Sequence, residues 1–271
     1  MNKPPSILPA AHALDASAQK VLDIEYHREA AASYDAVVTR NFRFFHVHSL
    51  HPWIRRLLGR TPWQPEVLDV GTGTGVVAVT LAKFGCRVAA IDHSPEMLAH
   101  ARARAQAAGV EHLLTLTRGD GELLPYSDAS FDAVTIQGVL HHLPDCLPML
   151  RESYRVLRVG GELYVSEPCG ESTPVTKLLN LALAPARWAK RILRGPGAVG
   201  PTVSDHEAPV SGAGLEALAR SVGFEVSAEY LVRTGLMQVV PERLKIWVTL
   251  LLSWPTRHSR GDILFLVARK P

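Results

Sequence analysis

The hydrophobic and polar positions of this chain follow two alternating periods from residue 67 onward. Short apolar runs typical of buried strands, such as VLDV, RVAAID and FDAVTIQ, alternate with longer segments of helical spacing, such as VVAVTLAKFG and SPEMLAHARARAQAAG. Strands that alternate with helices are joined by crossovers, which produce a mostly parallel sheet covered on both faces. The pattern therefore predicts a doubly wound α/β fold.

Residues that favour helix ends support this pattern. Ser94 can accept hydrogen bonds from the free amides at the start of the helix that follows it, and Pro95 occupies the first turn, where no donor is needed. Gly109 suits the left-handed conformation that ends many helices. In the last hundred residues, Ser211 to Val222 is predicted as a helix closed by Gly223, and two strands are predicted over 224–232 and 262–268.

The remaining segments set the organisation of the chain. Residues 1–19 lack periodicity, whereas 21–58 have helical spacing with several aromatic residues. We therefore predict an N-terminal arm and helical cap over 1–60 and a core over 61–271. Two insertions, at about 171–210 and 235–258, are predicted to interrupt the core.

Composition excludes several classes of protein. The chain has 271 residues, of which 47% are hydrophobic and 20% charged, so it can bury a full core. Its net charge of +3 is too small to indicate a nucleic-acid partner. Three widely spaced cysteines form no zinc or disulfide pattern, and the longest apolar run is about half of the ~20 residues that a membrane-spanning helix needs. These features predict a cytoplasmic protein.

The segment VLDVGTGTG places Gly71, Gly73 and Gly75 at the turn from the first core strand into a helix. A turn without side chains lets a ligand approach the backbone closely, so a nucleoside pocket is the natural use. A rival interpretation is nicotinamide binding, because Gly73, Gly75 and Ala78 also satisfy a loose G-x-G-x-x-A dinucleotide fingerprint.

Two acids flank this turn. Asp92 ends the second predicted strand, close to the spacing at which an acid contacts ribose hydroxyls; the alternative is an exposed carboxylate at a strand end. Asp69 lies two residues before the first glycine. It could bind the cationic amino-acid end of a nucleoside cofactor or hold the turn through its carboxylate, and both interpretations stay open.

Five ordered motifs over residues 67–168 resemble the class I S-adenosylmethionine-dependent methyltransferases. They are VLDVGTGTG, AAIDHSPEML, GDGELLPYSDASFDAV, GVLHHL and RVLRVGGELYVSEP, and they are most similar to the small-molecule branch that contains the ubiquinone and menaquinone biosynthesis enzymes. The resemblance implies a seven-stranded sheet whose last strand is antiparallel. It also implies S-adenosyl-L-methionine as methyl donor and S-adenosyl-L-homocysteine as product.

The resemblance assigns residues to each part of the donor. Those implied to bind the cofactor are Asp69, Gly71, Gly73 and Gly75 for the methionine part, Asp92 and His93 for the ribose and adenine edge, Asp120 and Gly121 for the adenine, Gln137 near the sulfonium, and Tyr34 in the cap that closes over the donor. Physically, a carboxylate at Asp120 can accept from the adenine amino group. A turn-forming role is the alternative for Asp120.

A sulfonium is an excellent leaving group, so the protein must chiefly align the acceptor and exclude water. A general base is needed only for a hydroxyl or an acidic carbon, and O- or C-methylation is favoured here. Candidate bases are His141, His142 and His206, which are expected beyond the carboxyl ends of parallel strands. The His-His pair could instead support the floor of the pocket. No metal is expected, because His46, His48 and His51 lack a ligand pattern such as H-E-x-x-H.

The two insertions bear on the acceptor. The first interleaves Trp188 and Ile192 with basic residues, as in helices that lie at a lipid interface, and the second is unusually apolar. They fit a lid over a quinone, polyketide or lipid-like molecule, with peripheral membrane contact. A homodimer interface or plain core fits equally well.

Alternatives for the whole chain are a nicotinamide-dependent oxidoreductase and a non-catalytic module that binds S-adenosylmethionine. A nucleic-acid substrate is disfavoured, because GVLHHL stands where N-P-P-Y would be expected.

Overall fold

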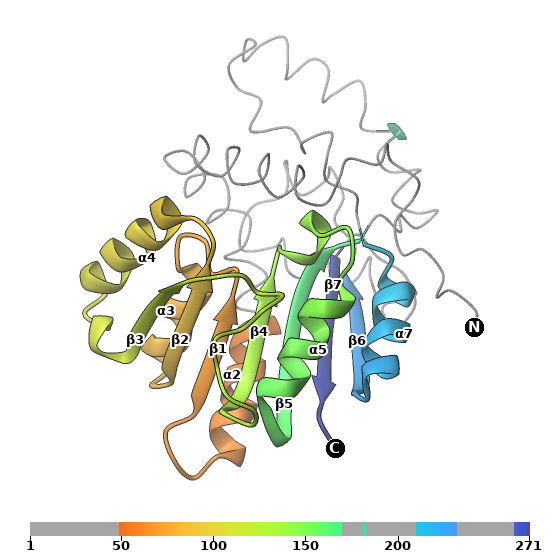
Figure 1. The fold of residues 1–271 in the computed structure, drawn as a ribbon, viewed down its shortest axis with the longest axis horizontal. Coiled ribbons are helices and arrows are strands. Elements are labelled where there is room, and N and C mark those ends of the chain that lie inside the picture. The colour runs from red at the N-terminus through yellow and green to blue at the C-terminus, as the bar shows by residue number, and fades with distance from the viewer. Residues whose placement is uncertain (1–48, 170–180, 183–209, 232–262) are drawn as a thin grey trace.

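The computed structural model describes residues 49–169, 181–182, 210–231 and 263–271. Seven strands in these ranges form one sheet in the order β3-β2-β1-β4-β5-β7-β6 (Figure 1). The strands are β1 (Glu66–Val70), β2 (Arg87–Asp92), β3 (Leu114–Arg118), β4 (Phe131–Gln137), β5 (Leu157–Pro168), β6 (Glu225–Leu231) and β7 (Ile263–Arg269). The pairs among β3, β2, β1, β4 and β5 are parallel, whereas β7 is antiparallel to both β5 and β6. The predicted doubly wound sheet with an antiparallel last strand is confirmed.

Helices cover both faces of the sheet. They are α2 (His51–Arg60), α3 (Val76–Lys83), α4 (Pro95–Ala107), α5 (Leu147–Val156) and α7 (Gly212–Val222), with short 3₁₀ turns η2 (Glu111–Leu113) and η3 (Leu140–His142). Side chains alternate across each strand: Leu163 and Val165 pack into a core with α5 and α7, whereas Tyr164 packs into a second core with α2 and α3. Because both faces of the sheet are buried, the sequences of the central strands are continuous apolar runs.

The helix ends follow the predicted chemistry. The Oγ of Ser94 accepts a hydrogen bond from the Met97 amide at 3.2 Å, and Gly109 and Gly223 have φ of +68° and +115°. Helix α5 was not among the predicted elements. It begins at Leu147 without a side-chain cap and passes directly into β5 after Val156. No glycine or proline therefore separates the helical periodicity of α5 from the strand periodicity of β5.

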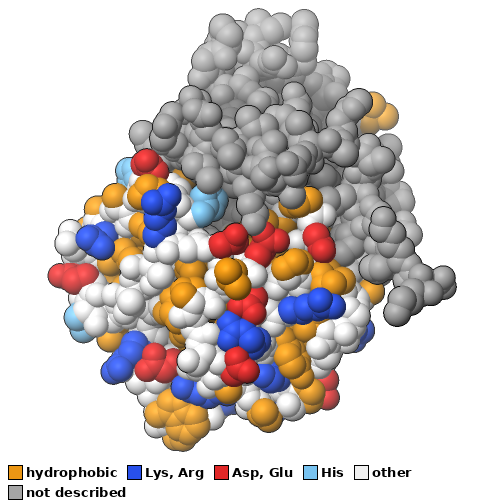
Figure 2. All heavy atoms as spheres, in the orientation of Figure 1, with side chains coloured by type: hydrophobic (Ala, Val, Ile, Leu, Met, Phe, Trp, Pro, Cys, Tyr) orange, Lys and Arg blue, Asp and Glu red, His pale blue; other side chains and the backbone are white. Residues whose placement is uncertain are grey.

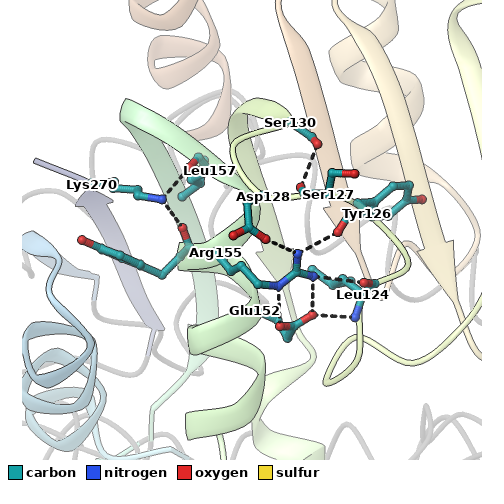
Figure 3. Close-up of polar contacts among 10 residues, drawn as sticks. Leu124, Tyr126, Ser127, Asp128, Ser130, Glu152, Arg155, Leu157 and Lys270 are labelled. Atoms are coloured by element: carbon teal, nitrogen blue, oxygen red, sulfur yellow. Dashed lines mark hydrogen bonds and ion pairs between the residues drawn. The ribbon is translucent and has the colours of Figure 1, made fainter.

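Arg155 fastens the connection between β3 and β4 to α5 (Figure 3). Its guanidinium pairs with Glu152 and with Asp128, at 2.7 and 2.8 Å, and donates to the carbonyls of Tyr126 and Leu124 at 2.7 and 3.1 Å. The hydrogen bond from Arg155 holds the pKa of Glu152 below its ordinary value. The contacts fix a segment that follows the carboxyl end of β3 and would otherwise be a free loop.

Two further polar contacts hold outer elements to the sheet. The Lys270 ammonium, at the end of β7, donates to the carbonyls of Tyr154 and Leu157 at 2.8 Å each (Figure 3). At the other end of the described chain, the indole of Trp53 in α2 donates to the Glu162 carboxylate of β5 at 2.9 Å, and Trp53 is fully buried. Helix α2 is therefore part of the core packing of the sheet. The proposed division at residue 60 stays a prediction.

The N-terminal arm, most of the helical cap and nearly all of both insertions lie outside the described residues. Within the described ranges, no helix is both long and apolar enough to cross a membrane.

Candidate active site

The glycine turn joins β1 to α3 at the carboxyl edge of the sheet. Its first two amides, those of Gly71 and Thr72, donate to the Ile91 carbonyl of the neighbouring strand at 2.9 and 3.0 Å. The Gly75 amide donates to the Thr72 carbonyl at 2.9 Å. The values of φ at Gly71, Gly73 and Gly75 are +66°, +52° and +78°, a conformation that residues with a Cβ rarely adopt.

The three glycines are needed for three different reasons. A Cβ on Gly71 would lie 2.4 Å from a methyl of Val139, in the loop after β4. A Cβ on Gly75 would lie 2.8 Å from the Cβ of Ala101, because α4 crosses closely over this position. A Cβ on Gly73 would have no heavy atom of the described residues within 4 Å. Of the three, Gly73 therefore offers the open approach that a ligand needs, while Gly71 and Gly75 permit close packing.

Asp92, at the end of β2, holds the turn in place. Its Oδ2 accepts from the Gly73 amide at 2.8 Å and its Oδ1 from the Ser94 amide at 2.9 Å. The residue is buried, with 7% of its surface exposed, so it is not the solvated strand-end carboxylate of the alternative interpretation. Each carboxylate oxygen has two lone pairs, which leaves capacity for a ligand hydroxyl beside each backbone bond.

Asp69 lies below the turn within the core. Its two oxygens accept from the hydroxyls of Thr72 and Thr135, at 2.7 and 2.6 Å. Burial raises the pKa of Asp69 to about 6; the hydrogen bonds from Thr135, Thr72 and the Ala78 amide oppose this increase, and the charge of Asp92 adds to it. Of the two roles left open by the sequence, this geometry favours support of the turn.

The other predicted donor contacts lie along the same edge. His93 directly follows β2, and its carbonyl accepts from the Arg118 guanidinium at 3.2 Å. Asp120 follows β3, is exposed, and accepts from the Glu122 amide at 2.9 Å in a turn. Gln137 is the last residue of β4 and is half-buried. The structure thus places predicted residues at the same edge of the sheet, after β2, β3 and β4, with β1 lying between β2 and β4.

Gly121 differs from the expectation that it presents its backbone to an adenine. A Cβ at this position would lie 2.6 Å from both Met149 in α5 and Val70 in β1. Close packing between elements alone is a sufficient reason for glycine here. Adenine contact at Gly121 stays a prediction.

The loop after β4 carries two of the predicted bases. The Nδ1 of His141 lies 2.8 Å from Oε2 of Glu167, at the end of β5, and the His142 ring stacks on that of His141 with centroids 4.0 Å apart. Glu167 Oε1 also accepts from the amides of Val139 and Leu140, at 2.8 and 2.9 Å. Glu167 therefore holds this loop through three contacts, two to its backbone and one to the ring of His141.

Two candidates cannot be placed, because Tyr34 and His206 lie outside the described residues. Other contacts were not foreseen, chiefly those of Thr72 and Thr135 with Asp69 and of Val139 with Gly71. A sequence signal existed for Thr135, which is a polar residue inside the apolar run FDAVTIQ and so needs a buried partner.

The electrostatic character of this edge is acidic. Figure 2 shows Asp and Glu side chains gathered along the upper border of the described surface, next to the atoms that are not described. Burial raises the pKa of the nearby Cys146 thiol to about 12, with further contributions from Glu167, Asp145 and Glu122. A thiol with such a pKa is not a nucleophile, whereas an acidic edge suits a cationic ligand.

A doubly wound sheet with a glycine turn after β1 and a buried acid at the end of β2 is the arrangement typical of nucleoside-binding α/β proteins. The strand β7 lies antiparallel between β5 and β6, as expected for the fold that the resemblance to methyltransferases implies. Residues 68–165 match the family described as methyltransferase domain. Over these residues the chain is therefore similar to methyltransferase domains.

Curated relatives agree with this class. The demethylmenaquinone methyltransferase of Corynebacterium efficiens is 42% identical over 125 residues, which cover 45% of this chain and 50% of the relative. The sarcosine/dimethylglycine N-methyltransferase of Halorhodospira halochloris is 36% identical over 149 residues, which cover 52% of this chain and 53% of the relative. The chain thus spans about half the length of the curated relatives it matches.

Solved structures share the fold at low identity. A SAM-dependent methyltransferase from Thermotoga maritima superposes with a TM-score of 0.52 at 19% identity, covering 88% of this chain and 98% of its own. The 4+2 cyclase SpnF superposes with a TM-score of 0.54 at 22% identity, covering 81% of each chain. These likenesses show the fold alone, and the cyclase illustrates that the fold does not fix the reaction.

Proposed function

We propose that this protein transfers the methyl group of S-adenosylmethionine to a small hydrophobic molecule by in-line displacement. The observation that carries the proposal is the bond between the Gly73 amide and Asp92, which fixes an open glycine turn against an acid at the carboxyl edge of β1 and β2. In that position the carboxylate can accept from the ribose while the turn follows the methionine part.

The remaining donor contacts extend this arrangement. We assign His93 and Asp120 to the adenine edge and Gln137 to the region near the sulfonium, because they follow β2, β3 and β4 at the same edge of the sheet. Gly71, Gly75 and Asp69 support the turn from behind. Tyr34, from the cap, is proposed to close over the donor.

The acceptor is proposed to be a quinone, a polyketide or a lipid-like molecule, methylated on oxygen or carbon. The similarity to demethylmenaquinone methyltransferases over the central motifs supports this class. A second candidate is an amine, because the sarcosine/dimethylglycine N-methyltransferase matches a longer part of the chain. A direct comparison uses labelled S-adenosylmethionine with menadiol or sarcosine as acceptor. Faster product formation with menadiol supports the first class, and faster formation with sarcosine replaces it by the second.

Donor binding is tested by calorimetric titration with S-adenosylhomocysteine. Asp92→Asn is expected to weaken binding about tenfold to a hundredfold, the usual cost of removing a charged hydrogen-bond partner. Asp132→Asn is the matched control, because Asp132 is also buried and also accepts a backbone amide, that of Glu66 at 2.9 Å, but at the amino end of β4. Tight NADH binding without affinity for S-adenosylhomocysteine would instead favour the oxidoreductase alternative. Donor binding without turnover would favour the non-catalytic module.

We also propose that the insertions cover the acceptor and contact a membrane surface peripherally, with the protein acting in the cytoplasm. The apolar and basic composition around Trp188 and Trp254 supports this proposal, and three buried free cysteines are compatible with a reducing compartment. Replacing both tryptophans by Ser should reduce co-sedimentation with anionic vesicles. Equal recovery of the wild type and the double variant in the supernatant would favour the homodimer alternative. Analytical ultracentrifugation then measures whether the protein dimerises.

A further inference from the structure

Glu167, near the end of β5 at the carboxyl edge of the sheet, has no exposed side-chain surface. Its carboxylate receives three bonds: Oε1 accepts the amides of Val139 and Leu140, and Oε2 lies 2.8 Å from Nδ1 of His141. The two amides can only donate, so this end of the carboxyl group must accept. The arrangement is a built site in which a carboxyl group orients a histidine.

The pairing decides which ring nitrogen of His141 carries the proton. A carboxylate offers no proton, so the neutral imidazole donates from Nδ1, and this hydrogen bond is strengthened by the charge of its acceptor. The proton on Nδ1 leaves the basic lone pair on Nε2. About 12% of the His141 side chain is exposed, so the ring reaches the surface while its partner does not.

The same loop lies against the donor turn. Glu167 accepts a hydrogen bond from the Val139 amide. The side chain of Val139 lies against Gly71, so close that a Cβ on Gly71 would be only 2.4 Å from one of its methyl groups. The loop that carries His141 is thus seated on the glycine turn by van der Waals contact. Glu167 therefore fixes the histidine relative to the pocket proposed for the methyl donor.

We propose that His141, held by Glu167, is the general base of the reaction, and that the acceptor is an ionisable hydroxyl of the phenol or enol type. This inference rests on the proposed function. His141 Nε2 takes the hydroxyl proton, the acceptor oxygen forms a bond to the methyl carbon, and the sulfur–methyl bond breaks to leave the neutral thioether. The imidazolium is stabilised by the Glu167 carboxylate and later releases its proton to water.

The chemistry of the alternative acceptor explains why this pair is informative. A neutral amine is already nucleophilic and needs no base before transfer, whereas a hydroxyl is a poor nucleophile until its proton is removed. A buried carboxylate that fixes the orientation and protonation of a histidine therefore has a direct use with a hydroxyl acceptor, and none in the methyl-transfer step of a neutral amine. Glu167 is a positioning residue in this proposal, and His141 is the catalytic one.

Glu167→Gln gives a sharp test, because the variant changes one contact and keeps the other. The amide oxygen can still accept from Val139 and Leu140, while the NH₂ group now faces Nδ1 of His141 and requires it to accept. The proton of the imidazole is then expected to move to Nε2, which removes the basic lone pair. Glu162→Gln is the control, since Glu162 lies on the same strand, is buried, and bonds to Trp53 in the other core.

The first readout is the histidine tautomer, measured by long-range proton–nitrogen NMR on ¹⁵N-labelled protein saturated with S-adenosylhomocysteine; His141→Gln identifies the signal. We expect Nδ1–H in the wild type and in Glu162→Gln, and Nε2–H in Glu167→Gln. An Nε2–H tautomer in the wild type, or the same tautomer in wild type and Glu167→Gln, would overturn the inference. A merely structural role for Glu167 would not move this signal.

The second readout is turnover with menadiol and with sarcosine as acceptors. We expect menadiol to be the better acceptor, and Glu167→Gln to lower kcat for it by at least about a hundredfold, as expected for loss of the correct tautomer. Turnover of sarcosine in preference to menadiol, or a wild-type rate in Glu167→Gln, would overturn the inference. If neither acceptor is methylated, the NMR measurement of the His141 tautomer decides between the outcomes. Calorimetry separates the two proposals: failure of the wild type to bind S-adenosylhomocysteine refutes the proposed function, whereas normal binding with the wrong tautomer refutes this inference alone.

Discussion

Alanine substitutions at two glycines only two positions apart should damage different properties of the protein. Gly73 and Gly75 both have positive φ, +52° and +78°, so alanine at either position pays a similar backbone cost. Their surroundings differ, since a Cβ at Gly73 meets no described atom within 4 Å, whereas a Cβ at Gly75 lies 2.8 Å from the Cβ and 2.9 Å from the Cα of Ala101. One substitution should damage the ligand site and the other the packing of α4.

The magnitudes follow from these contacts. The left-handed conformation costs alanine roughly 1–2 kcal/mol, which is the whole expected loss of unfolding free energy for Gly73→Ala. Gly75→Ala adds an overpacking cost of about 1–3 kcal/mol, because the backbone of Ala101 must move. We therefore expect Gly75→Ala to lose about 3 kcal/mol in total, which a domain of ordinary stability survives.

Urea unfolding and calorimetry with S-adenosylhomocysteine measure the two effects separately. Gly73→Ala should lose at least about tenfold in donor affinity, because its methyl group enters the open space assigned to the donor; that factor corresponds to about 1.4 kcal/mol. Gly75→Ala should show the larger loss of stability. The reasoning is refuted if Gly73→Ala unfolds as easily as Gly75→Ala, or if Gly73→Ala retains wild-type donor affinity.

Three further substitutions test the core below the site. Burial raises the pKa of Asp69 to about 6, so the folded state binds more protons than the unfolded one in this range, and wild-type stability should fall relative to Asp69→Asn by about 2 kcal/mol as pH rises from about 4 to 7. Urea unfolding over a pH series checks this, and a pH-independent difference would contradict it. Arg155→Met should cost roughly 2 kcal/mol in unfolding free energy through its lost charged hydrogen bonds, with donor affinity unchanged by calorimetry. Trp53→Phe leaves an oxygen of Glu162 without its indole donor and should cost about 1–3 kcal/mol in chemical unfolding; an unchanged midpoint would argue against a stabilising bond.

Much of the fold was predictable from the sequence, because it depends on local patterns. The strands beginning near Val67, Arg87 and Phe131 are apolar on both faces, and helix ends at Ser94, Gly109 and Gly223 have the expected caps. Helix α5 has a proline, Pro148, in its first turn but no such signal at its end. Its junction with β5 at Leu157 carries no glycine or proline, so the sequence does not mark the change from helical to strand periodicity.

The glycine turn was also predictable from the sequence, but the reasons for its individual glycines were not. The sequence identifies Gly71, Gly73 and Gly75 as one motif, whereas the structure separates them by what lies beside each backbone. The neighbours of Gly71 and Gly75, Val139 and Ala101, come from distant segments of the chain. Periodicity and composition carry no record of which segments meet.

The acceptor side illustrates the same limit more strongly. His141 and Glu167 are 26 residues apart in the chain, yet their side chains meet because β4 and β5 are adjacent parallel strands whose carboxyl ends reach the same edge. A fold of this kind is shared with the 4+2 cyclase SpnF, so the sheet by itself does not select a reaction. What selects it is the chemistry of the few side chains that the sheet brings together. In the proposed reaction, the carboxylate that holds a histidine beside the glycine turn serves an acceptor hydroxyl that must lose its proton, which is why the tautomer of His141 tests the choice of acceptor.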